Sequence, residues 1–124
     1  MITDLSSNLE TNSISWVFEN VTIEKEVANI KGRSVILDKT NKFVLVLHKI
    51  ENTENYELIE FGGDGTEVFR INPPENHTFY YLSHHPDASV SVVCQGPPDE
   101  YGRMDYHFSI NTKNGKLKLL GLAY

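Results

Sequence analysis

Apolar and polar residues alternate with a period of two along most of this 124-residue chain. Around Trp16, for example, apolar side chains occupy every second position, at Ile14, Trp16 and Phe18. Successive side chains of a β-strand point to opposite faces, so this spacing gives a strand one apolar face. The segment 43–47 is apolar throughout, which is typical of a central strand buried on both faces. We therefore expect a chain made mainly of β-strands.

Turn-forming residues divide the chain into short segments. Gly62-Gly63-Asp64-Gly65 and Asn114-Gly115 predict hairpin turns, because glycine and asparagine tolerate positive φ. Proline pairs at 73–74 and 97–98 mark loops, because proline cannot donate to a sheet. The predicted strands lie at 14–18, 43–50, 56–61, 68–71, 79–82, 90–94, 104–110 and 116–122, with less regular patterns at 21–30 and 34–37. The pattern predicts a single all-β domain over residues 1–124, an antiparallel sandwich or partly closed barrel or meander of about eight to ten strands.

The first residues of the chain have a different spacing. Ile2, Leu5 and Leu9 are three and four positions apart, and Thr3 or Asp4 could cap a helix that starts there. This spacing predicts a short N-terminal helix.

The order of strands and turns is repeated, with a spacing of about 46 to 50 residues. The second copy consists of the runs Phe79-Tyr80-Tyr81-Leu82, Val90-Ser91-Val92-Val93, Tyr106-His107-Phe108-Ser109-Ile110 and Asn114-Gly115-Lys116-Leu117. Residues 34–122 therefore resemble two blades of a β-propeller, and the resemblance implies two four-stranded antiparallel sheets. The chain lacks a Trp-Asp pair, and two blades cannot close a ring, so an ordinary meander is the alternative.

Acidic residues gather in one short segment. Residues 51–67 contain six of them and no Lys or Arg, and they account for the whole formal net charge of −6. Complementary charge speeds association and sets specificity, so the segment predicts a basic protein partner. Charge that protects a sheet edge is the alternative, and alternation places Glu57 and Glu60 on opposite faces of a strand. The predicted partner-binding residues are Glu51, Glu54, Glu57, Glu60, Asp64 and Glu67, with Tyr101 in the loop 95–103.

The same charge argues against several other partners. Nucleic acids and anionic membranes both select basic surfaces, so we expect neither as a partner. The chain starts without a basic region followed by an apolar core, and it has no apolar run of about 20 residues. With a single cysteine, Cys94, no internal disulfide can form. We expect a cytoplasmic protein.

Histidines offer the best candidates for metal binding or catalysis. His77, His84, His85 and His107 lie in the second half of the chain, near Asp87 and Asp105. Their spacing matches no zinc motif, and adjacent His84 and His85 would point to opposite faces of a strand. Cys94 lies in an apolar run, where a thiol is inert. We expect no catalytic residue, no metal and no cofactor.

Three functions follow as hypotheses. The first is a non-enzymatic protein-interaction module, in its sharpest form an acidic inhibitor that masks a basic partner such as a toxin, as immunity proteins do. The second is a small enzyme or a metal- or ligand-binding protein that uses the region of His77, His84, His85 and His107. The third is a structural subunit in which blade-like units assemble. The sequence leaves the oligomeric state open.

Overall fold

The computed structural model describes residues 1–123, apart from the side chain of Arg33, and consists of eleven β-strands in three antiparallel sheets. The first sheet contains β1 (Thr3–Asn8), β2 (Ser13–Phe18) and β3 (Val21–Glu26). The second contains β4 (Ile30–Leu37), β5 (Phe43–Lys49), β6 (Tyr56–Gly62) and β7 (Glu67–Ile71). The third contains β8 (Thr78–Ser83), β9 (Ser91–Gln95), β10 (Asp105–Ile110) and β11 (Leu117–Leu122). The all-β prediction is confirmed, and none of the three sheets closes into a barrel.

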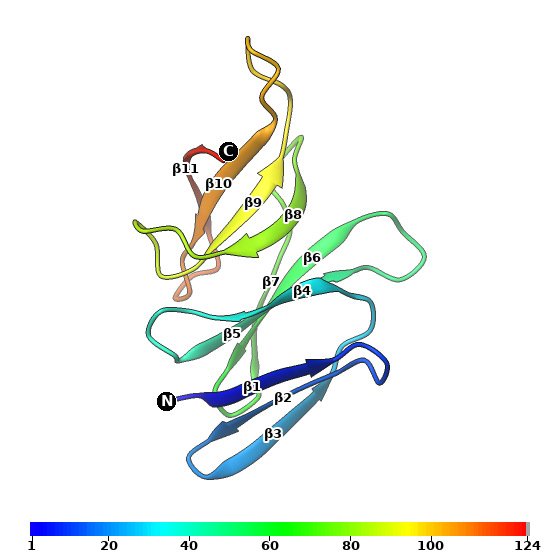
Figure 1. Cartoon of the computed structure of the whole chain (residues 1–124), viewed down its shortest axis with the longest axis vertical. Coiled ribbons are helices and arrows are strands. Elements are labelled where there is room, and N and C mark those ends of the chain that lie inside the picture. The colour runs from blue at the N-terminus through cyan, green and yellow to red at the C-terminus, as the bar shows by residue number, and fades with distance from the viewer. Residues whose placement is uncertain (124) are drawn as a thin grey trace.

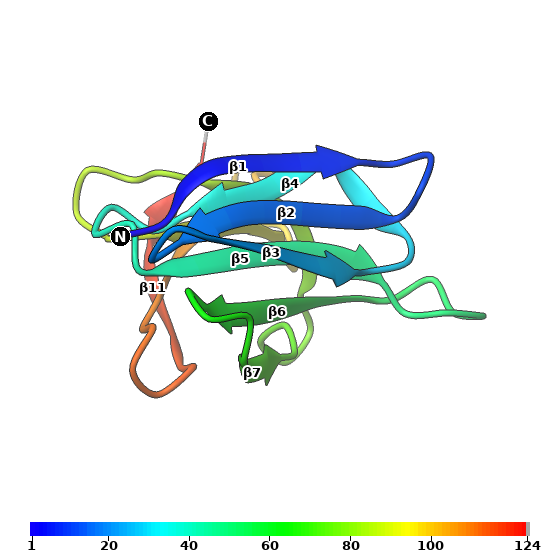
Figure 2. The ribbon, with the colours of Figure 1, turned by 90° about the horizontal axis from the view of Figure 1, so that it is seen from below.

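The three sheets are stacked as layers, with the second sheet in the middle (Figures 1 and 2). Each is a meander, because strands that pair in space also follow one another in sequence. The two sets of four strands expected from the internal repeat correspond to β4–β7 and β8–β11. Strand β8 contacts β4, β5 and β6, and β1 contacts β4, so the layers are joined along the sides formed by these strands.

The second sheet is buried on both faces, as the apolar segment 43–47 predicted. On β5, Val44 and Val46 point toward the first sheet, and Leu45 and Leu47 point toward the third. All four side chains are fully buried. Two separate hydrophobic clusters therefore share this sheet, one on each face.

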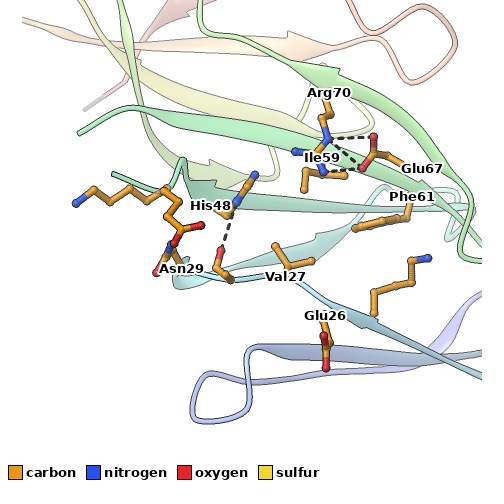
Figure 3. A pocket seen from close by; sticks show the side chains of 12 residues that line it. Glu26, Val27, Asn29, His48, Ile59, Phe61, Glu67 and Arg70 are labelled. Atoms are coloured by element: carbon orange, nitrogen blue, oxygen red, sulfur yellow. Dashed lines mark hydrogen bonds and ion pairs between the residues drawn. The ribbon is translucent and has the colours of Figure 1, made fainter. Parts of the chain in front are cut away.

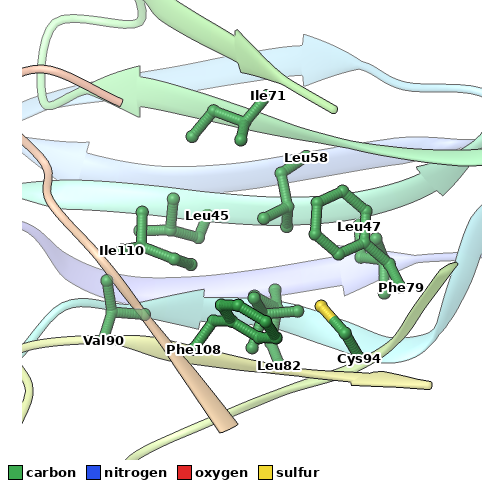
Figure 4. Close-up of a cluster of buried hydrophobic side chains, with 11 residues drawn as sticks. Leu45, Leu47, Leu58, Ile71, Phe79, Leu82, Val90, Cys94, Phe108 and Ile110 are labelled. Carbon is green, nitrogen blue, oxygen red and sulfur yellow. The ribbon is translucent and has the colours of Figure 1, made fainter. Parts of the chain in front are cut away.

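The cluster between the second and third sheets is drawn in Figure 4. It brings together residues from β5, β6, β7, β8, β9 and β10, with Cys94 among them. Its buried members are Leu45, Leu47, Leu58, Ile71, Phe79, Leu82, Val90, Val92, Cys94, Phe108 and Ile110. Burial at this scale is the main force that joins the two layers, because each large aliphatic or aromatic side chain contributes about 1.5–3 kcal/mol.

The cluster between the first and second sheets is built around Trp16. This side chain is fully buried, and its indole Nε1–H donates to the carbonyl oxygen of Gly63 at 2.6 Å. Its ring centroid lies 6.0 Å from that of Phe61 on β6. The other buried members are Ile2, Ile14, Val27, Ile30, Val44, Val46 and Ile59.

The expected N-terminal helix is wrong, because residues 3–8 form strand β1. The pairing of β1 with β2 shifts in register between Thr3 and Ser6, and Asp4 has a φ of 56°. Such a bulge places an extra residue in one strand. Ile2 and Leu5 consequently contact the same hydrophobic cluster although they are three residues apart. The bulge thus allows residues with a helix-like spacing in the sequence to share one face of a strand.

The structure has one strand more than the upper limit of the expected eight to ten, because β1 replaces the helix. The predicted segments 21–30 and 34–37 correspond to β3 and β4, with β4 starting earlier than expected, at Ile30. Residues 27–29 separate the two strands, and Asn29 has a φ of 60°. The hairpin between β2 and β3 also relies on positive φ, at Glu19 (51°) and Asn20 (63°), a conformation suited to two-residue hairpin loops.

Candidate functional site

The first sheet has three strands, whereas each of the other two has four. Beyond β3, part of the second sheet along β6 and β7 therefore has no strand of the first sheet over it (Figure 2). A groove of about 380 Å³ lies at this place. We call it the β3 groove (Figure 3); it is lined by Lys25, Glu26, Val27, Ala28, Asn29, His48, Lys49, Glu51, Ile59, Phe61, Glu67 and Arg70.

One wall of the β3 groove is an ion-pair network centred on Arg70 of β7. Its Nη1 lies 2.6 Å from Oε1 of Glu57, and its Nη2 lies 2.9 Å from Oε1 of Glu67. Glu57 also accepts a hydrogen bond from Nε2 of His48 at 2.9 Å, and Nδ1 of His48 lies 3.3 Å from the carbonyl oxygen of Ala28. The hydrogen bond to Glu67 is the largest of the interactions that raise the pKa of Arg70. The network fixes charged side chains from three strands, and it keeps the guanidinium charged.

Exposed carboxylates lie on β3 and at the rim of the β3 groove. Glu26 and Glu51 line the groove, and Glu24 is exposed on the outer face of β3, outside it. Within residues 1–123 none of these three carboxylates forms an ion pair. Of the lysines in the groove, Lys49 pairs with Glu54 at 3.4 Å, and Nζ of Lys25 lies 5.7 Å from the Phe61 ring centroid. A partner that contacts the three unpaired carboxylates is expected to be basic.

The acidic segment is spread over the structure instead of forming one surface. Glu51 and Glu54 lie in the turn at the start of β6, and Asp64 lies in the turn at its end (Figure 2). Glu57 and Glu67 are held by Arg70 in the network described above. Of the predicted partner-binding carboxylates, only Glu51 and Glu67 line the β3 groove.

Glu60 is not available to a partner, because its side chain is fully buried. It pairs across strands with Leu45 and Phe69, which both belong to the layer between the second and third sheets. Neither carboxyl oxygen has a hydrogen-bond partner among the described residues. Burial, with a smaller effect of the Asp38 charge, raises its pKa to about 7.

Asp38 is also buried but keeps its charge, which explains its effect on Glu60. Burial acts to raise the pKa of Asp38, but hydrogen bonds from Thr40, Phe43 and Lys42 together lower it. The amide nitrogens of Lys42 and Phe43 each donate at 2.9 Å, and the hydroxyl of Ser89 donates at 3.1 Å. Asp38 thus closes the β4–β5 turn and has a structural role.

Tyr101 is 73% exposed, as expected, but it lies far from the acidic segment. Its loop joins β9 to β10, at the opposite end of the molecule from β3 (Figure 1). Asp99 organises this loop, because its carboxylate accepts from the amides of Tyr101 (2.8 Å) and Arg103 (2.9 Å). The guanidinium of Arg103 lies 4.9 Å from the Tyr101 ring centroid. Tyr101 therefore cannot act in one surface with the β3 groove.

Replacement of Asp99 by alanine should loosen this loop without unfolding the protein. Two amides lose their acceptor, and such local bonds contribute about 0.5–1.5 kcal/mol each. We expect proteolytic cleavage within residues 96–104 to become about tenfold faster, while the free energy of unfolding falls by about 1–3 kcal/mol. Glu100→Ala, in the same exposed loop, is the control and should leave the cleavage rate unchanged. Equal cleavage rates for Asp99→Ala and the wild type would show that Asp99 does not hold the loop.

The structure brings two of the four candidate histidines together. The rings of His85 and His107 lie 5.0 Å apart, and Nδ1 of His107 is buried without a hydrogen-bond partner among the described residues. His84 instead donates to the carbonyl oxygen of Leu37 at 2.8 Å. His77 packs edge-on against Phe108, with ring centroids 5.4 Å apart.

The His85–His107 pair lacks the further ligands that a metal site needs. Among residues 1–123, no three His, Cys, Asp or Glu side chains lie where they could share a metal ion. Asp105 accepts from Gln95 at 3.2 Å, and Asp87 lies 4.0 Å from Nδ1 of His85. Burial, followed by the neighbouring His85, lowers the pKa of His107, so its ring is neutral at neutral pH.

Cys94 is fully buried in the cluster between the second and third sheets. Burial raises the pKa of its thiol to about 12, so the thiolate that a nucleophile or a metal ligand requires does not form at neutral pH. The described residues also include no helix that is long and apolar enough to cross a membrane.

Comparison of the chain with protein-family models, with curated proteins and with solved structures finds no match in any of the three. Sequence reasoning missed Lys25, His48 and Arg70, which come from three different strands and meet only when the sheets stack.

Proposed function

We propose that this chain is a non-enzymatic protein-interaction module that docks a basic partner at the β3 groove. The observation that carries the proposal is the three-stranded first sheet, which leaves a groove where the other two sheets would have a fourth strand. Binding sites are commonly concave surfaces that combine apolar lining with a few fixed polar groups. Ile59 and Phe61 supply apolar lining here, and the Arg70 network supplies fixed polar groups.

The expected charge of the partner follows from the exposed carboxylates of β3 and of the rim of the β3 groove. Glu24, Glu26 and Glu51 present carboxylates that have no ion pair within residues 1–123. The net charge of −6 acts in the same direction at longer range, because it attracts cationic partners before contact. A basic toxin that is masked by this protein remains the sharpest form of the proposal.

The chemistry of the remaining candidates supports a binding role more than a catalytic one. The Cys94 thiol is protonated at neutral pH, and within residues 1–123 no third His, Cys, Asp or Glu side chain completes a metal site with the His85–His107 pair. Glu60 has the raised pKa of a catalytic acid, but its side chain is fully buried and does not line the β3 groove.

A photoreactive amino acid in place of Glu51, at the rim of the β3 groove, tests the proposal. In extract of the native cell it should cross-link a basic protein, and cross-linking should fall as salt screens the charges. The partner, once identified by mass spectrometry and purified, should bind Glu26→Lys about tenfold more weakly than the wild type, a loss equal to about 1.4 kcal/mol.

The same photoreactive amino acid at Glu100 is the matched control, because it replaces an exposed glutamate in a loop of the third sheet. Capture of the same protein from both positions, or of an acidic partner from position 51, would contradict the proposal. Unchanged affinity for Glu26→Lys would also contradict it.

A further inference from the structure

Strand β3 differs from every other edge strand of the molecule. The six edge strands in the described residues are β1, β3, β4, β7, β8 and β11. Five of them have a register shift in their pairing, whereas β3 pairs with β2 over six consecutive residues without a shift. Register shifts and bulges protect edges against pairing with other strands. The edge of β3 is therefore the one with regular geometry for an additional strand.

The backbone of β3 has hydrogen-bonding groups that point away from β2. The amide of Val27, just after β3, donates to the carbonyl oxygen of Asn12 at 2.8 Å, so this position faces the β2 side. Alternate residues of an antiparallel strand direct their N–H and C=O groups to opposite sides. Lys25 and Ile23 therefore also face β2, whereas the backbone groups of Thr22, Glu24 and Glu26 face the open edge.

The side chains on and near the two faces of β3 determine which residue types suit each face of an added strand. Thr22, Glu24 and Glu26 are exposed on the polar face of the first sheet. Directly opposite residues share a face, so Lys or Arg would lie across from the two glutamates. The intervening residues of the added strand would point over β6 and β7, where Phe61 and Arg70 line the β3 groove. Apolar residues suit these positions, because they cover Phe61 and the aliphatic part of Arg70.

A second copy of this chain is a poor occupant for the edge. Two β3 strands that pair antiparallel with their polar faces on the same side set Glu24 opposite Glu24, Glu26 or Thr22, depending on the register. In the first two registers like charges lie directly opposite each other, which destabilises a strand pair. In the third register Glu24 faces only a hydroxyl group, so a basic strand is the better occupant in every register.

We propose that an extended segment of a partner protein, alternating Lys or Arg with apolar residues, adds to the edge of β3 as a fourth strand. This mode rests on the proposed function, because it specifies how the partner occupies the β3 groove. Main-chain hydrogen bonds to an exposed edge give such complexes affinity, and alternate side chains give them specificity.

A capped peptide of alternating lysine and valine, six residues long like β3, is the probe for this proposal. In an NMR titration it should shift the amide signals of Thr22, Glu24 and Glu26 and bind about tenfold more tightly than a glutamate–valine peptide. Glu24→Lys/Glu26→Lys should reverse this preference. Glu75→Lys/Glu100→Lys changes the net charge equally at exposed sites outside the first sheet and should keep it.

A comparison of Glu24→Pro with Glu24→Gln distinguishes the contribution of backbone hydrogen bonds to peptide binding from the contribution of charge. Proline removes an amide that faces the open edge, a position where an edge strand tolerates it, so the fold should persist by circular dichroism. Binding of the lysine–valine peptide should fall about tenfold below that of Glu24→Gln, which removes the same charge and keeps the amide.

The outcomes distinguish the two proposals. If the peptide shifts signals of Lys25 and Arg70 but binds Glu24→Pro and Glu24→Gln equally, the β3 groove is a docking site and strand addition is wrong. If neither β3 nor the β3 groove responds at millimolar peptide, both proposals fail. If the free protein dimerises and Glu24→Pro abolishes the dimer, a second copy is the occupant and the basic strand is wrong.

Discussion

At pH 8, Glu60→Gln is expected to unfold with a free energy about 2–3 kcal/mol higher than that of the wild type. The reason is the burial of the Glu60 carboxyl without a hydrogen-bond partner in the described residues. Ionisation in such a place is unfavourable because the charge loses its hydration. Glutamine has nearly the same shape but never ionises, so the substitution removes this charge and replaces one carboxyl oxygen by an amide N–H2 group.

The pH dependence of this gain has a definite sign. The folded-state pKa of Glu60 is about 7, above the ordinary value of 4.5 that applies to the unfolded chain. Between these values the folded state binds the proton more tightly, so the wild type loses stability as pH rises and the loss is complete above about pH 8. Below about pH 4.5 both states are protonated, and Glu60→Gln should match the wild type within about 1 kcal/mol.

Urea unfolding of both proteins at pH 5 and pH 8 measures the effect. Taking the difference between them at each pH removes His107, whose lowered pKa acts in the opposite direction. Glu57→Gln is the control on the same strand, since Glu57 is paired with Arg70 and its loss should lower stability at pH 8. Equal stability of Glu60→Gln and the wild type at pH 8 would show that Glu60 is hydrated or paired there.

Trp16→Ala is expected to lower the free energy of unfolding by about 3–5 kcal/mol, the largest loss for a single side chain of this protein. Trp16 is fully buried at the centre of the cluster that joins the first sheet to the second. Its removal leaves a cavity beside Phe61 and takes the donor from the Gly63 carbonyl. Urea unfolding followed by far-UV circular dichroism measures the loss.

Two further substitutions test whether the loss of stability comes from the packing of Trp16 and not from the shortening of a side chain as such. Trp16→Phe keeps an aromatic ring but loses the indole N–H, so it should cost about 1–3 kcal/mol. Leu119→Ala removes a side chain that is 55% exposed, and it should change stability by less than about 0.5 kcal/mol. Losses of similar size for Trp16→Ala and Leu119→Ala would mean that the first sheet is not held by this cluster.

Strands β1 and β5 show how far alternation predicts this fold. For β5, five consecutive apolar residues predicted a strand buried on both faces, because only stacking on two sides can cover them. In the region of β1, Ile2 and Leu5 are three residues apart, a spacing that indicated a helix. The strand has a bulge instead, which lets both side chains contact the same hydrophobic cluster. Local periodicity therefore succeeds where strands are regular and fails where an extra residue shifts the pairing.

The candidate site was harder to predict, because it depends on how the sheets stack. Glu51 and Glu67 of the acidic segment line one groove, but the turns at the two ends of β6 separate Glu51 from Asp64. The edge of β3 is open because β3 is the last strand of its meander and the chain continues into β4 of the second sheet.

Hydrogen exchange at the backbone amides of β3 tests the binding account most directly. In the free protein, the amides of Thr22, Glu24 and Glu26 should exchange rapidly, and those of Ile23 and Lys25 should be protected by β2. With the lysine–valine peptide near saturation, the three outward-facing amides should slow by about tenfold, while the other two change little. Protection of the outward-facing amides in the free protein, or unchanged exchange in the saturated complex, would contradict the claim that β3 receives a partner strand.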